Sequence, residues 1–112
     1  MQKSDRKNER AARMGKNEAI ELLRLYKSVL SKHLDFDKLY MYGSFAKGTN
    51  NEDSDIDVAV IVDRLNEDYF DITPLLWRLR REIDLRIEPV LLEKGRDDSG
   101  FLQEITENGI EI

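Results

Sequence analysis

Hydrophobic side chains recur at every third or fourth position between residues 17 and 34, the spacing that gathers them on one face of a helix. The stripe contains Ile20, Leu23, Tyr26, Leu30 and Leu34, and it is widened by Leu22, Leu25 and Val29. This pattern predicts an amphipathic helix that packs its apolar face against the rest of the chain.

Two strands are predicted next. Residues 36–42 are rich in strand-forming side chains and end at Gly43. Residues 55–62 alternate, so that one face carries Ile56, Val58, Val60 and Val62. The small and polar residues 43–54 between the two segments have the composition of a functional loop.

A turn and a second helix are predicted after these strands. Asn66 is a candidate cap for a turn that carries Glu67 and Asp68. Thr73 followed by Pro74 is typical of the N-cap and first position of a helix. The hydrophobic residues of that helix are Leu75, Leu76 and Leu79.

Hydrophobic and charged residues alternate from Ile83 to Pro89, which predicts a third strand. Its polar face carries Asp84, Arg86 and Glu88. Pro89 indicates that the later half of the strand is an edge. A turn-rich stretch at 93–100 then precedes a short helix, with residues 110–112 extended after it. The helix contains Phe101, Leu102 and Ile105, and Asn108 and Gly109 would end it.

This order of elements predicts an α/β or α+β domain with a small mixed sheet and flanking helices. The 112 residues, 40% of them hydrophobic, suit one domain. We expect a charged N-terminal tail over residues 1–15 and the domain over residues 16–112. The sequence has neither an apolar run long enough for a membrane span nor a signal peptide, so a cytoplasmic protein is expected.

Charge and residue usage exclude several function classes. A net charge of −5 argues against binding of long nucleic acids, which needs many cationic contacts to phosphates. The basic residues near the N-terminus indicate a solvated tail, with a docking arm for an acidic partner as the alternative. The chain has no cysteine and a single histidine, His33, so thiolate nucleophiles, Cys-ligated zinc and a hydrolase triad are excluded. Any catalysis must therefore use carboxylates.

Asp55 and Asp57 lie two positions apart on a predicted strand, so both carboxylates project from one face. Such neighbours raise each other's pKa unless a cation compensates. Mg²⁺ suits this role because it accepts carboxylate, water and phosphate oxygens, and Mn²⁺ is the alternative ion. Asp84 would complete a site for two ions if its strand lies beside this one.

Gly43 and Ser44 follow the first predicted strand directly. A glycine lets backbone N–H groups approach a phosphate, the Ser44 hydroxyl adds a donor, and Lys47 adds a positive charge. The segment is not a Walker A loop, because Lys47 precedes Gly48 instead of following it. We interpret Gly43, Ser44 and Lys47 as candidate nucleotide-binding residues.

Two other interpretations of the acidic residues compete. Asp53, Asp55 and Asp57 have the spacing of the first ligands of an EF-hand. The EF-hand is rejected because Val58 and Arg64 replace the glycine and the glutamate that such a loop requires. The second interpretation, an exposed polar rim of a strand, stays open on these residues alone.

Taken together, Gly43-Ser44, ten intervening residues and Asp55-Ile56-Asp57 resemble the signature of the DNA polymerase beta-like nucleotidyltransferase superfamily. The fuller runs Gly-Ser-Phe-Ala-Lys-Gly and Ser-Asp-Ile-Asp resemble its minimal nucleotidyltransferase members. Residues 81–86 look like the segment that supplies the last catalytic carboxylate, and residues 101–110 look like the short terminal helix. Lys47 departs from the frequent arginine, which keeps the charge but loses the bidentate fork.

The resemblance implies a nucleotidyltransferase-like fold and transfer of a nucleoside monophosphate, with ATP as the favoured donor, to a hydroxyl acceptor. It assigns the β and γ phosphates to Gly43 and Ser44, and two Mg²⁺ ions to Asp55 and Asp57. Asp84 would bind the catalytic ion.

Two nearby residues have secondary assignments. Glu88, on the same predicted face as Asp84, is the reserve candidate for the last carboxylate. Arg86 is interpreted as an ion-pair partner of both acids.

The resemblance also suggests a partner. Members of this size resemble antitoxins encoded beside HEPN-type ribonuclease toxins, and some transfer AMP to a toxin tyrosine. Because the domain uses almost the whole chain, the acceptor surface is expected on another protein or on a second copy of this chain. The alternatives are a binding module that neutralises its partner by contact alone, and transfer to a small molecule, which so short a chain favours least.

Overall fold

The structure is a computed structural model that describes residues 14–65 and 69–112. The elements are α2 (Lys16–Leu30), β1 (Lys38–Tyr42), α3 (Ser44–Lys47), β2 (Ile56–Val62), α4 (Tyr69–Leu79), the 3-10 turn η1 (Arg80–Glu82), β3 (Ile87–Glu93), α5 (Phe101–Asn108) and β4 (Ile110–Glu111). Most of the predicted tail and the predicted turn at 66–68 lie outside the described residues.

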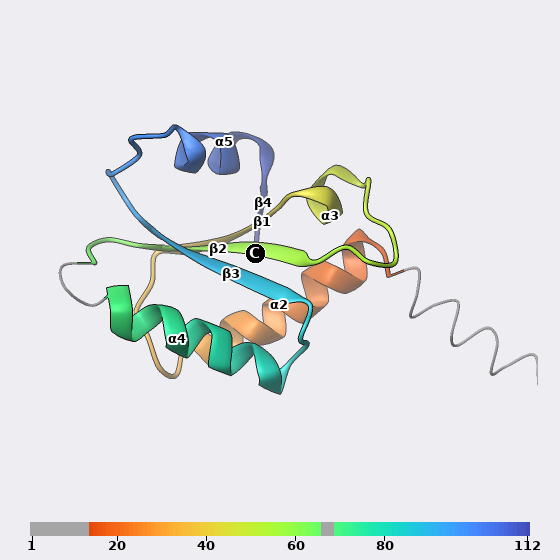
Figure 1. Cartoon of the computed structure of the whole chain (residues 1–112), viewed down its shortest axis with the longest axis horizontal. Coiled ribbons are helices and arrows are strands. Elements are labelled where there is room, and N and C mark those ends of the chain that lie inside the picture. The colour runs from red at the N-terminus through yellow and green to blue at the C-terminus, as the bar shows by residue number, and fades with distance from the viewer. Residues whose placement is uncertain (1–13, 66–68) are drawn as a thin grey trace, which may run out of the picture.

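The four strands form one mixed sheet in the order β3-β2-β1-β4. β2 runs parallel to β3, while β1 is antiparallel to both β2 and β4. α2 and α4 cover one face of the sheet, and α5 lies over the other (Figure 1). The predicted fold class, a small mixed sheet with flanking helices, is confirmed.

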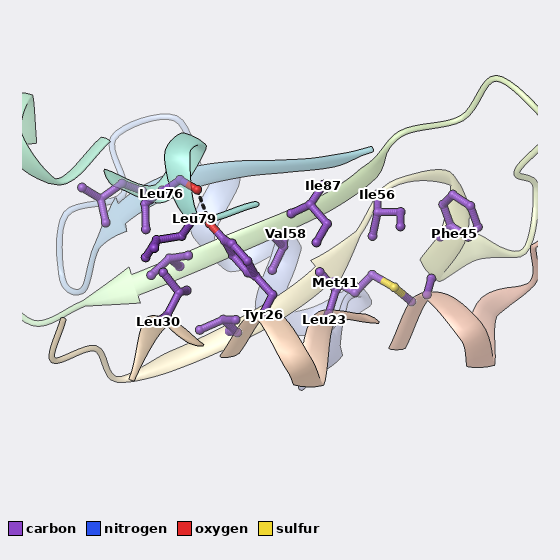
Figure 2. Packing of buried hydrophobic residues seen from close by; sticks show 14 of the residues in the cluster. Leu23, Tyr26, Leu30, Met41, Phe45, Ile56, Val58, Leu76, Leu79 and Ile87 are labelled. Atoms are coloured by element: carbon purple, nitrogen blue, oxygen red, sulfur yellow. Dashed lines mark hydrogen bonds between the residues drawn. The ribbon is translucent and has the colours of Figure 1, made fainter. Parts of the chain in front are cut away.

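Alternation along the strands divides the core between the two faces of the sheet. On the α2 side, buried side chains of the helix meet those of the strands, including Leu23, Leu30, Met41, Val58 and Ile87 (Figure 2). On the other side a smaller cluster consists of Tyr40, Ala59, Ile61 and Ile105. The predicted apolar stripe of α2 is confirmed at Leu23, Tyr26 and Leu30, which are fully buried, but Leu25, which was predicted to widen it, is 55% exposed.

Tyr26 links α2 to α4, the two helices that cover the same face of the sheet. Its buried hydroxyl donates a hydrogen bond of 2.7 Å to the Leu76 carbonyl oxygen of α4, drawn as a dashed line in Figure 2. We expect Tyr26→Phe to lower the free energy of unfolding by about 1–2 kcal/mol, because the carbonyl oxygen loses its buried donor. Urea unfolding would measure this, with Tyr69→Phe, on the exposed side of α4, as the control. An unchanged unfolding midpoint for Tyr26→Phe would contradict this role.

Two predicted helix boundaries are wrong. α2 ends at Leu30 rather than Leu34, because the chain tightens into a turn in which the His33 N–H donates to the Leu30 carbonyl oxygen at 2.9 Å. α4 includes Tyr69 and contains Pro74, so Thr73-Pro74 is not its start. Leu76 and Leu79 pack in the core and sustain the helix beyond Pro74, although proline removes one helical donor.

The bounds of the third predicted strand are also wrong: β3 begins at Ile87 rather than Ile83. The Arg80 guanidinium donates to the carbonyl oxygens of Leu85 and Ile87, at 2.9 and 3.1 Å, and the Asp84 N–H donates back to the Arg80 carbonyl oxygen at 2.8 Å. These bonds fold residues 83–86 into a turn.

None of the helices within residues 14–65 and 69–112 has both the length and the hydrophobicity that a membrane-spanning helix needs.

Candidate active site

Tyr42, Asp57 and Glu88 form one row across three neighbouring strands. The register pairs Tyr42 of β1 with Asp57 of β2, and Asp57 with Glu88 of β3. All three belong to the face that α5 covers, because residues two positions along, Tyr40 and Ala59, pack with Ile105 of α5. We call the acids Asp55, Asp57 and Glu88 the acidic row; its members Asp57 and Glu88 border the covered part of this face.

Gly43 brings the predicted phosphate-binding loop against this row. Its φ of +75° is a conformation that favours glycine, and a Cβ atom there would overlap Oδ2 of Asp57. Ser44 and Lys47 follow in the short helix α3, which the sequence did not predict, and Lys47 is exposed. The structure thus brings Gly43 and Asp57 together, and Ser44 follows Gly43 directly in the chain.

Three carboxylates influence one another at this edge of the sheet. Burial and the charge of Asp55 raise the pKa of Asp57. Burial raises the pKa of Glu88, as do the charges of Asp55 and Asp57, while the charge of Arg80 opposes them. Burial and the charges of Asp57 and Glu88 raise the pKa of Tyr42 to about 12. The site therefore has an excess of negative charge that a bound cation would relieve.

Asp84 has different surroundings. Its carboxylate accepts three hydrogen bonds from Arg86, two from the guanidinium and one from the backbone N–H, at 2.8–2.9 Å. These bonds lower the pKa of Asp84. In the described residues Arg86 pairs with Asp84 and not with Glu88, so the expected bridge between the two acids is wrong. Asp84 lies in the turn before β3 and outside the row.

The acidic row has donors of the type that Mg²⁺ prefers. The Asp57 carboxylate lies against Gly43, in a loop that can present phosphate oxygens as further ligands, and Asp55 and Glu88 are near enough to Asp57 for their charges to act on one another. Among residues 14–65 and 69–112, no group of three acidic or histidine side chains is already gathered at metal-binding geometry. The residue types fit a divalent ion, and binding would require these side chains to draw together.

The family comparison matches most of the chain. Residues 25–112 match the family described as "Polymerase beta, Nucleotidyltransferase", and this range includes every candidate site residue. The chain belongs to this nucleotidyltransferase family. The expected fold and family are thereby confirmed together.

Two relatives of the nucleotidyltransferase are informative. A "putative protein adenylyltransferase" of Methanocaldococcus jannaschii is 28% identical over 99 residues, which are 85% of this chain and 99% of that protein. A solved structure described as "a putative nucleotidyltransferase from Sulfolobus solfataricus" has a TM-score of 0.64 at 19% identity. The match covers 90% of this chain and 85% of the other, and it supports the fold.

The sequence alone did not predict that Tyr42 lies beside Asp57 of the candidate site, and it ranked Glu88 below Asp84. The signal for Glu88 was its period-two position on the third strand. Whether Glu88 lies beside Asp57 depends on the register between β3 and β2, which only the structure gives. No local motif marks Tyr42, because its position beside Asp57 results from the pairing of β1 with β2.

Glu88 and Asp84 can be distinguished by matched isosteric variants. We expect Glu88→Gln to lower the rate of nucleotidyl transfer by roughly a hundredfold or more, because a carboxylate of the acidic row loses its charge. Asp84→Asn should mainly lower stability, because the Arg86 guanidinium loses its ion pair. Steady-state rates and urea unfolding of both variants measure the difference. Greater loss of activity in Asp84→Asn than in Glu88→Gln would restore Asp84 as the last carboxylate.

Proposed function

We propose that this nucleotidyltransferase transfers a nucleoside monophosphate, preferably AMP, from a nucleoside triphosphate to a hydroxyl group on a partner protein. The observation that carries the proposal is the position of Asp57, which touches the glycine of the Gly-Ser loop and pairs in register with Glu88. A protein acceptor is supported by the relative from M. jannaschii, which is named an adenylyltransferase of proteins.

The loop and the acidic row have separate tasks in this proposal. Gly43 and Ser44 hold the β and γ phosphates, and the exposed Lys47 adds positive charge. Asp55, Asp57 and Glu88 would hold divalent ions, with Mg²⁺ preferred and Mn²⁺ as the alternative. When bound, such ions neutralise phosphate charge and lower the pKa of an attacking hydroxyl.

We infer the direction of attack from the order of the strands. In this proposal the triphosphate binds at Gly43, which follows β1, whereas Glu88 lies two strands away on β3. The acceptor oxygen approaches from the β3 side and bonds to the α-phosphorus. The bond from the α-phosphorus to the bridging oxygen breaks, pyrophosphate leaves in line, and the hydroxyl proton passes to solvent.

The proposed partner is a cytoplasmic protein of the HEPN type, and the chain acts as its antitoxin by modifying a tyrosine. This part of the proposal is supported by the resemblance of the Gly-Ser and Asp-Ile-Asp motifs to the minimal antitoxin members.

A labelling experiment tests the proposal. The purified chain, Mg²⁺ and ATP labelled in the α-phosphate are incubated with the product of the neighbouring gene, with γ-labelled ATP as the matched control. We expect the α label on the partner protein, the γ label in pyrophosphate, and a partner mass increased by one AMP. If the partner is neutralised while the α label stays in the nucleotide, the chain is a contact-only binding module instead.

A further inference from the structure

A cavity of about 180 Å³ opens beside the Gly-Ser loop. The end of β1 contributes Tyr42 and Gly43, α3 contributes Ala46 and Lys47, and α5 with the residue after it supplies the rest of the wall. That wall consists of Phe101, Glu104, Ile105, Asn108 and Gly109. The cavity is much larger than a site for a few waters, and it shares Gly43 with the proposed triphosphate site.

The walls suit a flat ring with a polar edge. The rings of Tyr42 and Phe101 meet edge to face, with centroids 5.4 Å apart, and Ile105 is buried beside them. Glu104 and Asn108 add a carboxylate and an amide at the same cavity. A pocket with mainly apolar and aromatic lining and a few polar groups is typical of sites for small planar ligands.

The position of the cavity indicates which of the two substrates of the proposed reaction it binds. The cavity lies at β1, α3 and α5, on the Gly43 side of the acidic row, whereas Glu88 and β3 lie at the opposite end of that row. The acceptor approaches from the β3 side, so a ligand that shares Gly43 with the phosphates belongs to the nucleotide. The part of a nucleotide that is planar and aromatic is its base.

We propose that this cavity binds the nucleobase of the nucleoside triphosphate, and that it selects bases carrying an exocyclic amino group. This inference rests on the proposed function. Phe101 and Tyr42 provide the apolar contact to the ring. The Glu104 carboxylate can only accept hydrogen bonds when ionised, so it favours an amino group and disfavours a carbonyl oxygen at that edge, while the Asn108 amide can pair with a ring nitrogen.

The probes are MgATP, MgITP and magnesium tripolyphosphate, titrated calorimetrically into the full chain. ITP differs from ATP in having a carbonyl in place of the amino group, and tripolyphosphate has no base. We expect ATP to bind roughly tenfold more tightly than ITP, because the hydrogen bond from the amino group to Glu104 forms with ATP and cannot form with the carbonyl oxygen of ITP. Glu104→Gln should reduce that preference while tripolyphosphate affinity stays constant.

Phe101→Ala tests the ring contact, and the side chain is 37% exposed, so its truncation leaves most of the core intact. We expect ATP affinity to fall roughly tenfold or more, as stacking of a base on an aromatic side chain is lost, with no change for tripolyphosphate. Phe70→Ala is the matched control, because Phe70 is 83% exposed on α4, at the other face of the sheet.

The outcomes separate this inference from the proposed function. If tripolyphosphate binds with Mg²⁺ but ATP and ITP bind equally, the selection for an amino group is overturned. If Phe101→Ala weakens ATP and tripolyphosphate by the same factor, the base pocket itself is overturned, and in both cases the triphosphate site stands. If neither ATP nor tripolyphosphate binds in the presence of Mg²⁺, the proposed function and the base pocket both fail.

Discussion

Asp57→Asn is expected to reduce pyrophosphate release from ATP by about a thousandfold or more. Asp57 is the carboxylate that touches Gly43 and pairs with Glu88. Its charge is therefore close to both the phosphate loop and the other acids of the acidic row. Losing it removes several kcal/mol of charge stabilisation, and each 1.36 kcal/mol corresponds to about a tenfold change in rate.

The same change should leave stability intact or increase it. The raised pKa of Asp57 means that folding disfavours its ionised form, so at neutral pH an uncharged asparagine removes an unfavourable charge. Asp63→Asn is the matched control, because Asp63 is an exposed acid directly after the other end of β2. Pyrophosphate release and urea unfolding of both variants measure the separation. Retained activity in a folded Asp57→Asn protein would remove Asp57 from the mechanism.

Gly43→Ala is expected to cost both stability and activity, whereas Gly95→Ala should cost stability alone. Both glycines have positive φ, +75° and +81°, so alanine introduces backbone strain of about 1–2 kcal/mol at either site. Only at Gly43 would the new methyl overlap Asp57, since a Cβ at Gly95 meets nothing within 4 Å. Displacing a reacting group by about 1 Å costs on the order of a hundredfold in rate.

The pair of alanine variants isolates the contact from the strain. Both variants should lower the unfolding midpoint, Gly43→Ala by more because its methyl group also overlaps Asp57, and pyrophosphate release reports the displacement that only Gly43→Ala produces. Equal activity in two folded variants would mean that the approach of Asp57 to Gly43 has no part in catalysis.

Local chemistry made part of this site predictable. The alternation at residues 55–62 placed Asp57 opposite the buried valines of β2, and the Gly-Ser pair marked the loop beside it. Each of these signals is a local pattern of neighbouring residues, so it can be recognised in the sequence alone. The resemblance to the nucleotidyltransferase superfamily used the same residues, and the family match to residues 25–112 confirmed it.

Contacts that leave no periodic pattern in the sequence explain what the sequence left out. The start of β3 depends on hydrogen bonds from Arg80 to carbonyl oxygens five and seven residues later, which no period-two pattern records. Four residues of shift moved Asp84 into a turn and left Glu88 in register with Asp57. The cavity beside Gly43 likewise needs α5 to pack near β1, so its lining residues are far apart in the sequence.

Calorimetric titration of ATP into the purified chain, with and without Mg²⁺, tests the proposed site most directly. The control is the double variant Asp55→Asn with Asp57→Asn, which keeps side-chain size while removing both charges. Our account predicts Mg²⁺-dependent binding to the unmodified chain and its loss in the folded double variant. Failure of the folded, unmodified chain to bind ATP in Mg²⁺, or equal binding by the double variant, would contradict it.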